Sequence, residues 1–288
     1  MRKKKNQGLI VLLLILIVTI ALSFLVGGCI KSCSGSNDDN NETTPPVPFE
    51  TDPVFAEVTT GEAVPSDPME KLALFAHKNG ISIEEYPDFL VDFMKKYPQT
   101  TDFVLNYPLI KANPPQIDLS DDVDSLTVPQ YIQWDERWGY IPYGDGVIAN
   151  TGCGPTCLSM VCVYLLDDPE LSPAYIADFS ERNGFCEPGN GSAWTLISEG
   201  GEYLGLNVEE LPLVESIVID ELLSDHPVIC VVGPGDFTDG GHFIVMTEYV
   251  DGMIKINDPN SIENSEKLWS FDDISEQINN LWACSKAY

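Results

Sequence analysis

The sequence predicts a mixed helix-and-sheet (α+β) domain in residues 127–288, and three observations indicate this fold class. A run without Gly or Pro follows Pro155 and continues to Leu166, and proline suits the first turn of a helix. An apolar strand, Phe243 to Tyr249, leads into Asp251-Gly252, a typical hairpin turn. Hydrophobic residues make up 44% of the chain and charged residues 21%, which is enough apolar material for a packed core.

The charge of the chain excludes one class of function and is unevenly distributed. With 45 acidic and 15 basic side chains the formal net charge is −30, which excludes a nucleic-acid binder held by phosphate contacts. Residues 1–31 carry five basic groups and no acid, whereas residues 127–288 carry 5 basic against 27 acidic groups. We therefore expect cationic or neutral substrates to approach this domain faster than anionic ones.

Residues 1–28 are predicted to be a targeting segment. Leu9 to Val26 contains no charge, and eighteen helical residues at about 1.5 Å each span about 27 Å, just enough to cross a bilayer core. This length favours an uncleaved single-pass anchor over a cleaved signal peptide. The lysines in front of it keep the N-terminus cytoplasmic, so the rest of the chain is expected to be extracellular.

A second interpretation of the same segment is a lipoprotein signal. Val26-Gly27-Gly28-Cys29 resembles a bacterial lipobox, in which the chain is cut before the cysteine and the thiol is lipidated. The segment length favours the anchor slightly, and a freely secreted protein is the third alternative. The first two interpretations both place the domain on the outer face of a cell membrane, attached through a helix or a lipidated Cys29.

The region between the targeting segment and the domain divides into three parts. Residues 29–63 are polar and rich in Pro, which predicts a disordered linker, and residues 113–126 form a second linker. Between them, residues 64–112 predict a small helical segment of two or three short helices, because Pro87, Pro98 and Pro108 interrupt it.

Capping patterns and apolar spacing predict the helices of residues 64–112. Asp67-Pro68 begins the first helix and Asn79-Gly80 ends it. The expected buried side chains are Leu72, Leu74, Phe75 and Ala76 in the first helix and Phe89, Leu90, Phe93 and Met94 in the second. We expect this segment to pack on the main domain. An inhibitory pro-segment is the alternative, but no visible feature would block a site.

Cys153 is the candidate nucleophile. It lies at or just before the N-terminus of the helix that contains Pro155, where unpaired N–H groups and the helix dipole stabilise a thiolate. The flanking glycines, Gly152 and Gly154, leave the sulfur approachable. Cys157 and Cys162 lie further along the same helix and are expected to be buried as small hydrophobic residues.

His242 is the candidate partner of this thiolate. It follows a glycine pair and begins the strand Phe243 to Tyr249, whereas His77 and His226 are most simply surface residues. The hairpin turn brings Asp258 close to the position across from His242, where a carboxylate would orient the imidazole. Asn257, which points to the other face, is the alternative orienting residue.

Attack on a carbonyl also requires donors where the oxyanion develops. A glutamine ahead of the nucleophile could join the backbone N–H of Cys153 in this role, and composition does not distinguish Gln133 from Gln130.

Together these residues resemble a known family, the C-thirty-nine-like cysteine peptidases, relatives of the double-glycine-leader (bacteriocin-processing) peptidases with a papain-like fold. The resemblance covers about residues 127–288. The motifs that carry it, in the order of the family, are Gln133-x-Asp135-x-x-Trp138, Tyr143-Gly144, Gly152-Cys153-Gly154-Pro155-Thr156, Gly241-His242-Phe243 and Asn257-Asp258-Pro259.

The resemblance implies a thiol hydrolase that needs no cofactor or metal. It implies Cys153 as nucleophile, His242 as general base and acid and Asp258 as orienting residue. It also implies Gln133 as oxyanion donor, with a peptide or protein as substrate. One alternative is a cell-wall amidase or cross-link hydrolase with the same chemistry, and another is a non-catalytic surface binding module. The pairing of Cys29, Cys33, Cys186, Cys230 and Cys284 stays open, and without a CxxC pair a zinc site has weak support.

Overall fold

The structure is a computed structural model, and it describes residues 65–123 and 126–287. The chain divides into two compact units, Met1–Gly61 and Glu62–Tyr288, of which only the second contains described residues. The predicted membrane segment, the lipobox and the linker of residues 29–63 lie outside the described residues. Within the described ranges, none of the helices combines the length and the apolar character that a membrane span needs.

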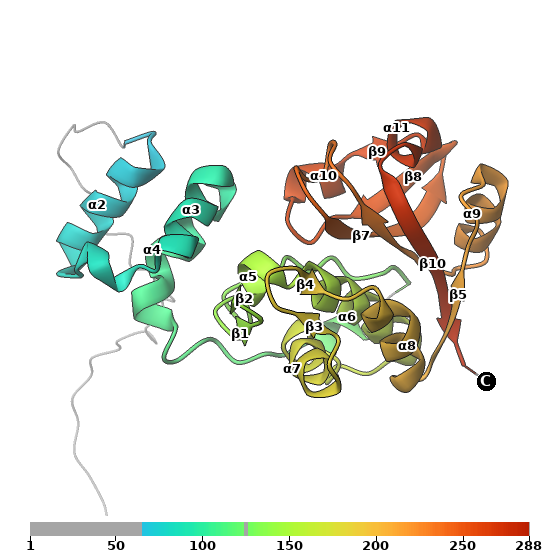
Figure 1. The fold of residues 1–288 in the computed structure, drawn as a ribbon, viewed down its shortest axis with the longest axis horizontal. Helices are drawn as coiled ribbons and strands as arrows, with labels where there is room; N and C mark the ends of the chain where they lie inside the picture. The colour runs from blue at the N-terminus through green and yellow to red at the C-terminus, as the bar shows by residue number, and fades with distance from the viewer. Residues whose placement is uncertain (1–64, 124–125, 288) are drawn as a thin grey trace, which may run out of the picture. The chain divides into compact units, whose positions relative to one another are not determined.

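A six-stranded antiparallel sheet forms the centre of the C-terminal region (Figure 1). Its spatial order is β5-β10-β6-β7-β8-β9, and every neighbouring pair is antiparallel. The strands are β5 (Leu206–Glu210), β6 (Val228–Val232), β7 (His242–Val250), β8 (Met253–Asn257), β9 (Leu268–Trp269) and β10 (Ile278–Lys286). The predicted α+β class is therefore confirmed as a mixed helix-and-sheet fold.

The central strands are apolar on both faces because each face covers a different core. On β6, Ile229 and Val231 pack into one cluster with helix α6 (Cys153–Leu166), whereas Val228, Cys230 and Val232 pack into a second cluster. This alternation is the two-residue period of a strand, and burial on both faces explains why β6 is continuously hydrophobic.

The helices cover the two faces of this sheet separately. Figure 1 shows α6, α7 (Pro173–Asn183) and α8 (Thr195–Tyr203) grouped together, whereas α9 (Glu215–Leu222) lies apart from them. Residues 154–163 of α6 are all buried, so this helix is the core of the first layer. The remaining short elements are α5 (Ile148–Thr151), α10 (Ile262–Glu266), α11 (Phe271–Ser275), and two ribbons, β1 (Pro142–Tyr143) with β2 (Gly146–Val147) and β3 (Cys186–Glu187) with β4 (Gly191–Ser192).

The N-terminal part of this unit is helical, as predicted. Its elements are α2 (Pro68–Asn79), α3 (Asp88–Lys96), α4 (Thr101–Ile110) and the short 3₁₀ turns Ile83–Glu85, Pro98–Thr100 and Ser120–Asp122. We call α2, α3 and α4 the prefix helices. Asp67 caps α2 and Gly80, with φ of 65°, ends it.

Two side chains of the predicted prefix core are exposed instead. Leu72, Ala76, Leu90, Phe93 and Met94 are buried, but Leu74 is 39% exposed and Phe89 is 37% exposed. Leu74 lies on the side of its helix away from Leu72 and Ala76. Phe89 lies at the edge of the buried side of α3, where it borders a cavity described below.

The prefix helices pack on the main domain, as the simpler interpretation predicted. The rings of Phe103 and Tyr140 stack with centroids 4.2 Å apart, and the Tyr140 hydroxyl donates to the Phe103 carbonyl at 2.8 Å. Tyr140, Val147 and Ala149 join the hydrophobic cluster of the prefix. In the stretch predicted to be a linker, residues 113–126, Leu119 is buried in the core around α6.

Candidate active site

Cys153 occupies the position that its sequence context predicted, at the N-terminus of α6. The backbone around it is tightly packed: a Cβ at Gly152 would lie 2.7 Å from the Ile148 carbonyl oxygen, and one at Gly154 would lie 2.7 Å from Ser192 Oγ. Both flanking positions therefore require glycine. They let α5 and strand β4 approach the helix end, and Cys153 as a residue stays partly exposed.

The surroundings of this thiol favour its ionised form. Burial of Cys153 opposes ionisation, but the hydrogen bond and charge of His242 outweigh it, together with the backbone N–H groups of Phe243 and Gly154. The pKa of Cys153 is thereby lowered from its ordinary value of 9.0. Burial instead raises the pKa of Cys157 and Cys162, about one and about two and a half turns along the same helix, well above that value. Of the three thiols on α6, only Cys153 is activated.

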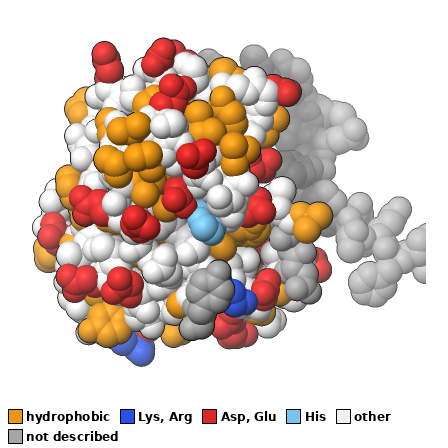
Figure 2. Space-filling view, turned by 90° about the vertical axis from the view of Figure 1, so that its right-hand side faces the viewer, with side chains coloured by type: hydrophobic (Ala, Val, Ile, Leu, Met, Phe, Trp, Pro, Cys, Tyr) orange, Lys and Arg blue, Asp and Glu red, His pale blue; other side chains and the backbone are white. Residues whose placement is uncertain are grey.

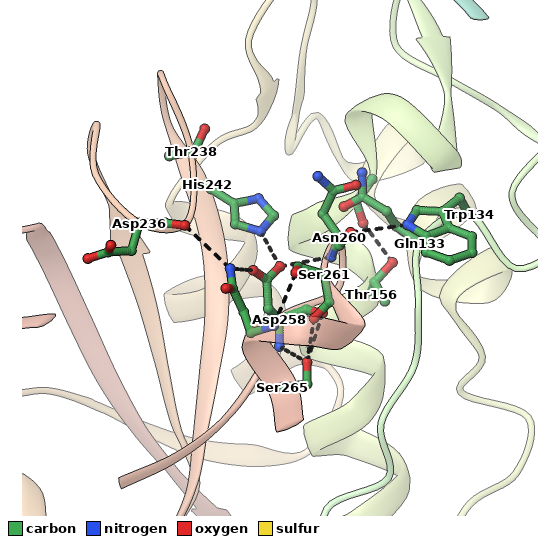
Figure 3. A network of polar contacts seen from close by, with 12 residues as sticks. Gln133, Trp134, Thr156, Asp236, Thr238, His242, Asp258, Asn260, Ser261 and Ser265 are labelled. Carbon is green, nitrogen blue, oxygen red and sulfur yellow. Dashed lines mark hydrogen bonds and ion pairs between the residues drawn. The ribbon is translucent and has the colours of Figure 1, made fainter. Parts of the chain in front are cut away.

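The β7–β8 hairpin brings His242 and Asp258 together. Asp251 and Gly252 both have positive φ, 53° and 84°, as a tight hairpin turn requires, and Val245 then lies opposite Asn257. His242 Nε2 donates to Asp258 Oδ1 at 2.8 Å (Figure 3). Because Nε2 is occupied in this way, Nδ1 is the ring nitrogen left for the Cys153 thiol.

The carboxylate of Asp258 controls the charge of this imidazole. Burial alone would lower the pKa of His242, but the charge and hydrogen bond of Asp258, and then those of Cys153, raise it well above its ordinary value of 6.5. The side chain of His242 is only 8% exposed and that of Asp258 is fully buried. The surroundings therefore favour a His242 imidazolium beside a Cys153 thiolate.

Asn257, the alternative orienting residue, does not lie against His242. Its Nδ2 donates to the carbonyl oxygens of Val128 and Pro129 at 3.3 and 3.1 Å. Successive residues of a strand point to opposite faces, so Asn257 fixes the segment that leads to Gln133 while Asp258 faces the histidine.

Two further donors hold the Asp258 carboxylate and a third group holds its backbone, and sequence reasoning missed all three. Oδ1 also accepts from the backbone N–H of Asn260 at 2.8 Å, and Oδ2 accepts from Asn264 Nδ2 at 2.9 Å (Figure 3). The backbone N–H of Asp258 donates to Ser265 Oγ at 2.9 Å. Ser261, which caps α10 by accepting from the Asn264 N–H, is the one sequence signal that could have indicated this helix.

Gln133, and not Gln130, lies beside the candidate nucleophile. Its backbone N–H donates to the Pro259 carbonyl at 2.7 Å and its Nε2 donates to the Ala149 carbonyl at 2.6 Å. The second Nε2 hydrogen is left for another acceptor. Gln130 is exposed and lines neither of the cavities described below.

Cys153 and His242 both line two cavities. The larger, of about 750 Å³, is bounded by the β1–β2 and β3–β4 ribbons and includes the carboxylates of Asp145 and Glu187. The smaller, of about 410 Å³, is bounded by α3 and by the loop that precedes His242. We call these the ribbon arm and the prefix arm of the cleft.

The surface around the domain is predominantly acidic. On the face drawn in Figure 2, Asp and Glu side chains are spread over the whole surface and Lys and Arg side chains are few. Of the eight cysteines, the six described ones (Cys153, Cys157, Cys162, Cys186, Cys230 and Cys284) are all free thiols, and Cys29 and Cys33 lie outside the described residues. The second predicted surface histidine, His226, pairs with Glu221 at 2.8 Å.

In a comparison with known protein families, residues 125–287 match the model of the Peptidase_C39 like family. Two solved structures are similar to the chain. One is the peptidase domain of Streptococcus ComA, a bi-functional ABC transporter involved in a quorum sensing pathway, with 20% identity, a TM-score of 0.36, and 47% of this chain and 92% of that chain covered. The other is a C39-like peptidase from Bacillus anthracis, with 15% identity, a TM-score of 0.34, and 60% and 98% coverage. No curated protein matches the chain.

Proposed function

Because the chain belongs to the Peptidase_C39 like family, which suggests a cysteine peptidase, we propose that it hydrolyses peptide bonds with Cys153 as nucleophile and His242 as general base and acid. Asp258 orients the imidazole. The observation that supports this proposal best is the arrangement of His242, which contacts the thiol of Cys153 and donates to the buried carboxylate of Asp258. Each ring nitrogen thus has one partner, as the chemistry requires.

The first half of the reaction is acylation. The Cys153 thiolate attacks the carbonyl carbon, and the negative charge passes to the carbonyl oxygen of a tetrahedral intermediate. The backbone N–H of Cys153, which lies in the first turn of α6 and has no intrahelical acceptor, donates to this oxygen together with the second Nε2 hydrogen of Gln133. As the C–N bond breaks, the His242 imidazolium gives its proton to the leaving amine, and a thioester remains on Cys153.

The second half is hydrolysis of that thioester. His242, now neutral, takes a proton from a water molecule, which attacks the thioester carbonyl. Collapse of the second intermediate releases the carboxylic acid and restores the thiolate and the imidazolium. Asp258 keeps the imidazole oriented throughout, because its carboxylate accepts from His242 and is itself held by Asn260 and Asn264.

Labelling with an electrophilic peptide probe tests the nucleophile. We expect a peptidyl acylating probe to modify the full chain once, Cys153→Ala to abolish the labelling, and Cys157→Ala, one helical turn away, to retain it. Intact-mass measurement and peptide mapping give the answer. Undiminished labelling of Cys153→Ala would disprove the assignment of Cys153 as nucleophile.

A comparison of substrates tests the substrate class. Hydrolysis of purified cell-wall material without hydrolysis of any peptide would show that the substrate is not a peptide.

We also propose that the protein is membrane-tethered with its peptidase domain outside the cell, on the basis of the apolar run Leu9 to Val26 and the lysines before it. The mass of the mature protein from membranes distinguishes the modes of attachment. An uncut N-terminus indicates the anchor, and a lipid on Cys29 that disappears in Cys29→Ser indicates the lipoprotein. Full-length chain found only in the culture medium would contradict both.

A further inference from the structure

The prefix arm of the cleft differs from the ribbon arm in how it is made. Both arms reach Cys153 and His242, but the ribbon arm consists of catalytic-domain residues alone. One wall of the prefix arm is α3, a helix outside the part of the chain that matches the family, and the other is the loop before β7. A peptide whose scissile bond lies at Cys153 has residues on both sides of that bond, so one of the two sides meets the prefix helices.

Helix α3 has two faces, and one of them is turned to this cavity. Leu90 and Met94 are fully buried in the prefix core, whereas Phe89 and Lys96 line the cavity. Phe93, which is 8% exposed, borders both the prefix core and the cavity. The spacing of residues 89, 93 and 96 follows one side of a helix, so two aromatic rings and a lysine face the cleft, with Asp92 beside them.

This wall is held in a fixed position next to the candidate triad. Gln99 Nε2, just after α3, donates to the backbone carbonyl of Asn260 at 2.6 Å, and Trp134 Nε1 donates to the same oxygen at 3.2 Å. Asn260 follows Asp258 by two residues, and its own N–H donates to the Asp258 carboxylate. Lys96 also pairs with Asp239 of the opposite wall at 3.3 Å. These contacts join the prefix helices to the residues around the candidate triad, so α3 is a structural part of the cleft.

Two buried amide oxygens of the prefix arm lack hydrogen-bond donors. Gln133 Oε1 and Asn260 Oδ1 find no partner among residues 65–123 and 126–287, although Gln133 is 4% and Asn260 7% exposed. Both residues line the prefix arm. A buried acceptor without a donor is unfavourable, and N–H groups of a bound peptide backbone are donors that match it.

We propose that the prefix arm is a substrate-binding site for the peptide residues on one side of the scissile bond. An aromatic or large apolar substrate side chain packs on Phe89 and Phe93, and N–H groups of the substrate donate to the free amide oxygens. The prefix helices are on this view a permanent part of the substrate site and not an inhibitory pro-segment. The inference rests on the proposed function, since it takes the cleft at Cys153 as the place where a peptide binds.

A binding experiment that needs no catalysis tests this site. In the full chain carrying Cys153→Ala, affinities are measured for labelled eight-residue peptides in which one position at a time is Phe, Gly or Asp. We expect one position at which Phe binds about tenfold tighter than Gly, a factor that fits burial of one aromatic ring. Phe89→Ala should remove this preference and Phe89→Trp should restore it. Leu109→Ala, which removes another exposed apolar side chain of the prefix helices, should leave it unchanged.

The outcomes separate this inference from the proposed function. A Phe preference that survives Phe89→Ala, or the absence of any peptide binding, overturns the prefix-arm site. The labelling of Cys153 in the otherwise unchanged protein reports independently on the nucleophile. If Cys153 is labelled but the Phe preference does not depend on Phe89, only the prefix-arm site is refuted. If Cys153 is not labelled but the Phe preference depends on Phe89, only the role of Cys153 as nucleophile is refuted.

Discussion

Helices α6 and α3 both border the cleft at Cys153, but they are held in different ways. Residues 154–163 of α6 are buried on all sides, so packing fixes the position of the thiol. Helix α3 buries one side and leaves Phe89 and Lys96 at the cavity. Under the two proposals above, this difference separates catalysis from substrate binding within one cleft. Changes around α6 should affect whether the reaction takes place, and changes on the free face of α3 should affect which peptide is bound.

The largest expected effect comes from removing His242, the proposed base that contacts the thiol at the end of α6. His242→Ala removes the group that activates the thiol and protonates the leaving amine, so kcat/KM for a peptide should fall on the order of 10⁴-fold. His226→Ala is the matched control, because His226 also pairs with a carboxylate, Glu221, but outside the cleft. Steady-state kinetics give the answer, and equal losses in the two variants would contradict the role of His242.

A smaller loss is expected when only the charge beside the histidine is removed. Asp258→Asn should lower kcat/KM on the order of 10²- to 10⁴-fold, because a neutral amide no longer stabilises the imidazolium. Asn257→Ala should instead lower the free energy of unfolding by about 1–3 kcal/mol, since it leaves the Val128 and Pro129 carbonyls without that donor.

The pH profile distinguishes these two variants. Asp258→Asn should shift the pH dependence of kcat/KM, whereas Asn257→Ala should leave its shape unchanged and lower only the thermal stability. A shifted profile in Asn257→Ala, or an unshifted one in Asp258→Asn, would mean that the adjacent asparagine is the orienting residue.

The pH dependence of thiol alkylation gives an effect of intermediate size. The thiolate is present above the pKa of Cys153, which is lowered, and the imidazolium is present below the pKa of His242, which is raised. Both shifts widen the range in which the reactive pair exists. Alkylation of Cys153 by iodoacetamide should therefore be fast at pH 7, where an ordinary thiol is only roughly 1% ionised. A rate that rises only near the ordinary thiol pKa would contradict the ion pair.

The acidic surface should produce a smaller, salt-dependent effect in the ribbon arm. Asp145 and Glu187 line this arm, so a peptide with a basic residue should be cleaved several-fold faster than its acidic counterpart at low salt. The advantage should shrink as added salt screens the charges. The comparison is made as kcat/KM at low and high ionic strength, and equal values for both peptides at low salt would count against it.

The smallest effect is expected from the ion pair that joins the walls of the prefix arm. The side chains of Lys96 and Asp239 are 49% and 86% exposed, so Lys96→Ala should change the free energy of unfolding by less than about 1 kcal/mol. A large loss of stability in a denaturant titration would show that α3 is held mainly by this pair and not by the burial of Leu90, Phe93 and Met94 in the prefix core.

Local signals explain which parts of the fold and site the sequence predicted. A proline in the first turn placed Cys153 at a helix end, and the Asp251-Gly252 turn set the hairpin that joins His242 to Asp258. These features depend on residues that are close in the chain, where backbone preferences decide the geometry.

The features that the sequence did not predict depend on contacts between distant segments. Phe89 was expected in the prefix core because apolar spacing in a nine-residue helix does not show which apolar side chain faces a cavity. Leu119 is one of four large apolar residues in the stretch 113–126, and the sequence does not show that it is buried while Leu126 is exposed. Asn264 reaches Asp258 only because α10 folds back over the end of β8.

The hydrogen bond between Gln99 and Asn260 links residues that are 161 positions apart in the chain. Synthesis runs from the N-terminus, so a growing chain contains the prefix helices and the thiol of Cys153 well before it contains His242 and Asp258. The imidazole of His242, the carboxylate of Asp258 and the Asn260 carbonyl that Gln99 contacts are all made after the thiol. The nascent protein therefore carries Cys153 without the histidine that lowers its pKa until residue 242 has been made and β7 has folded.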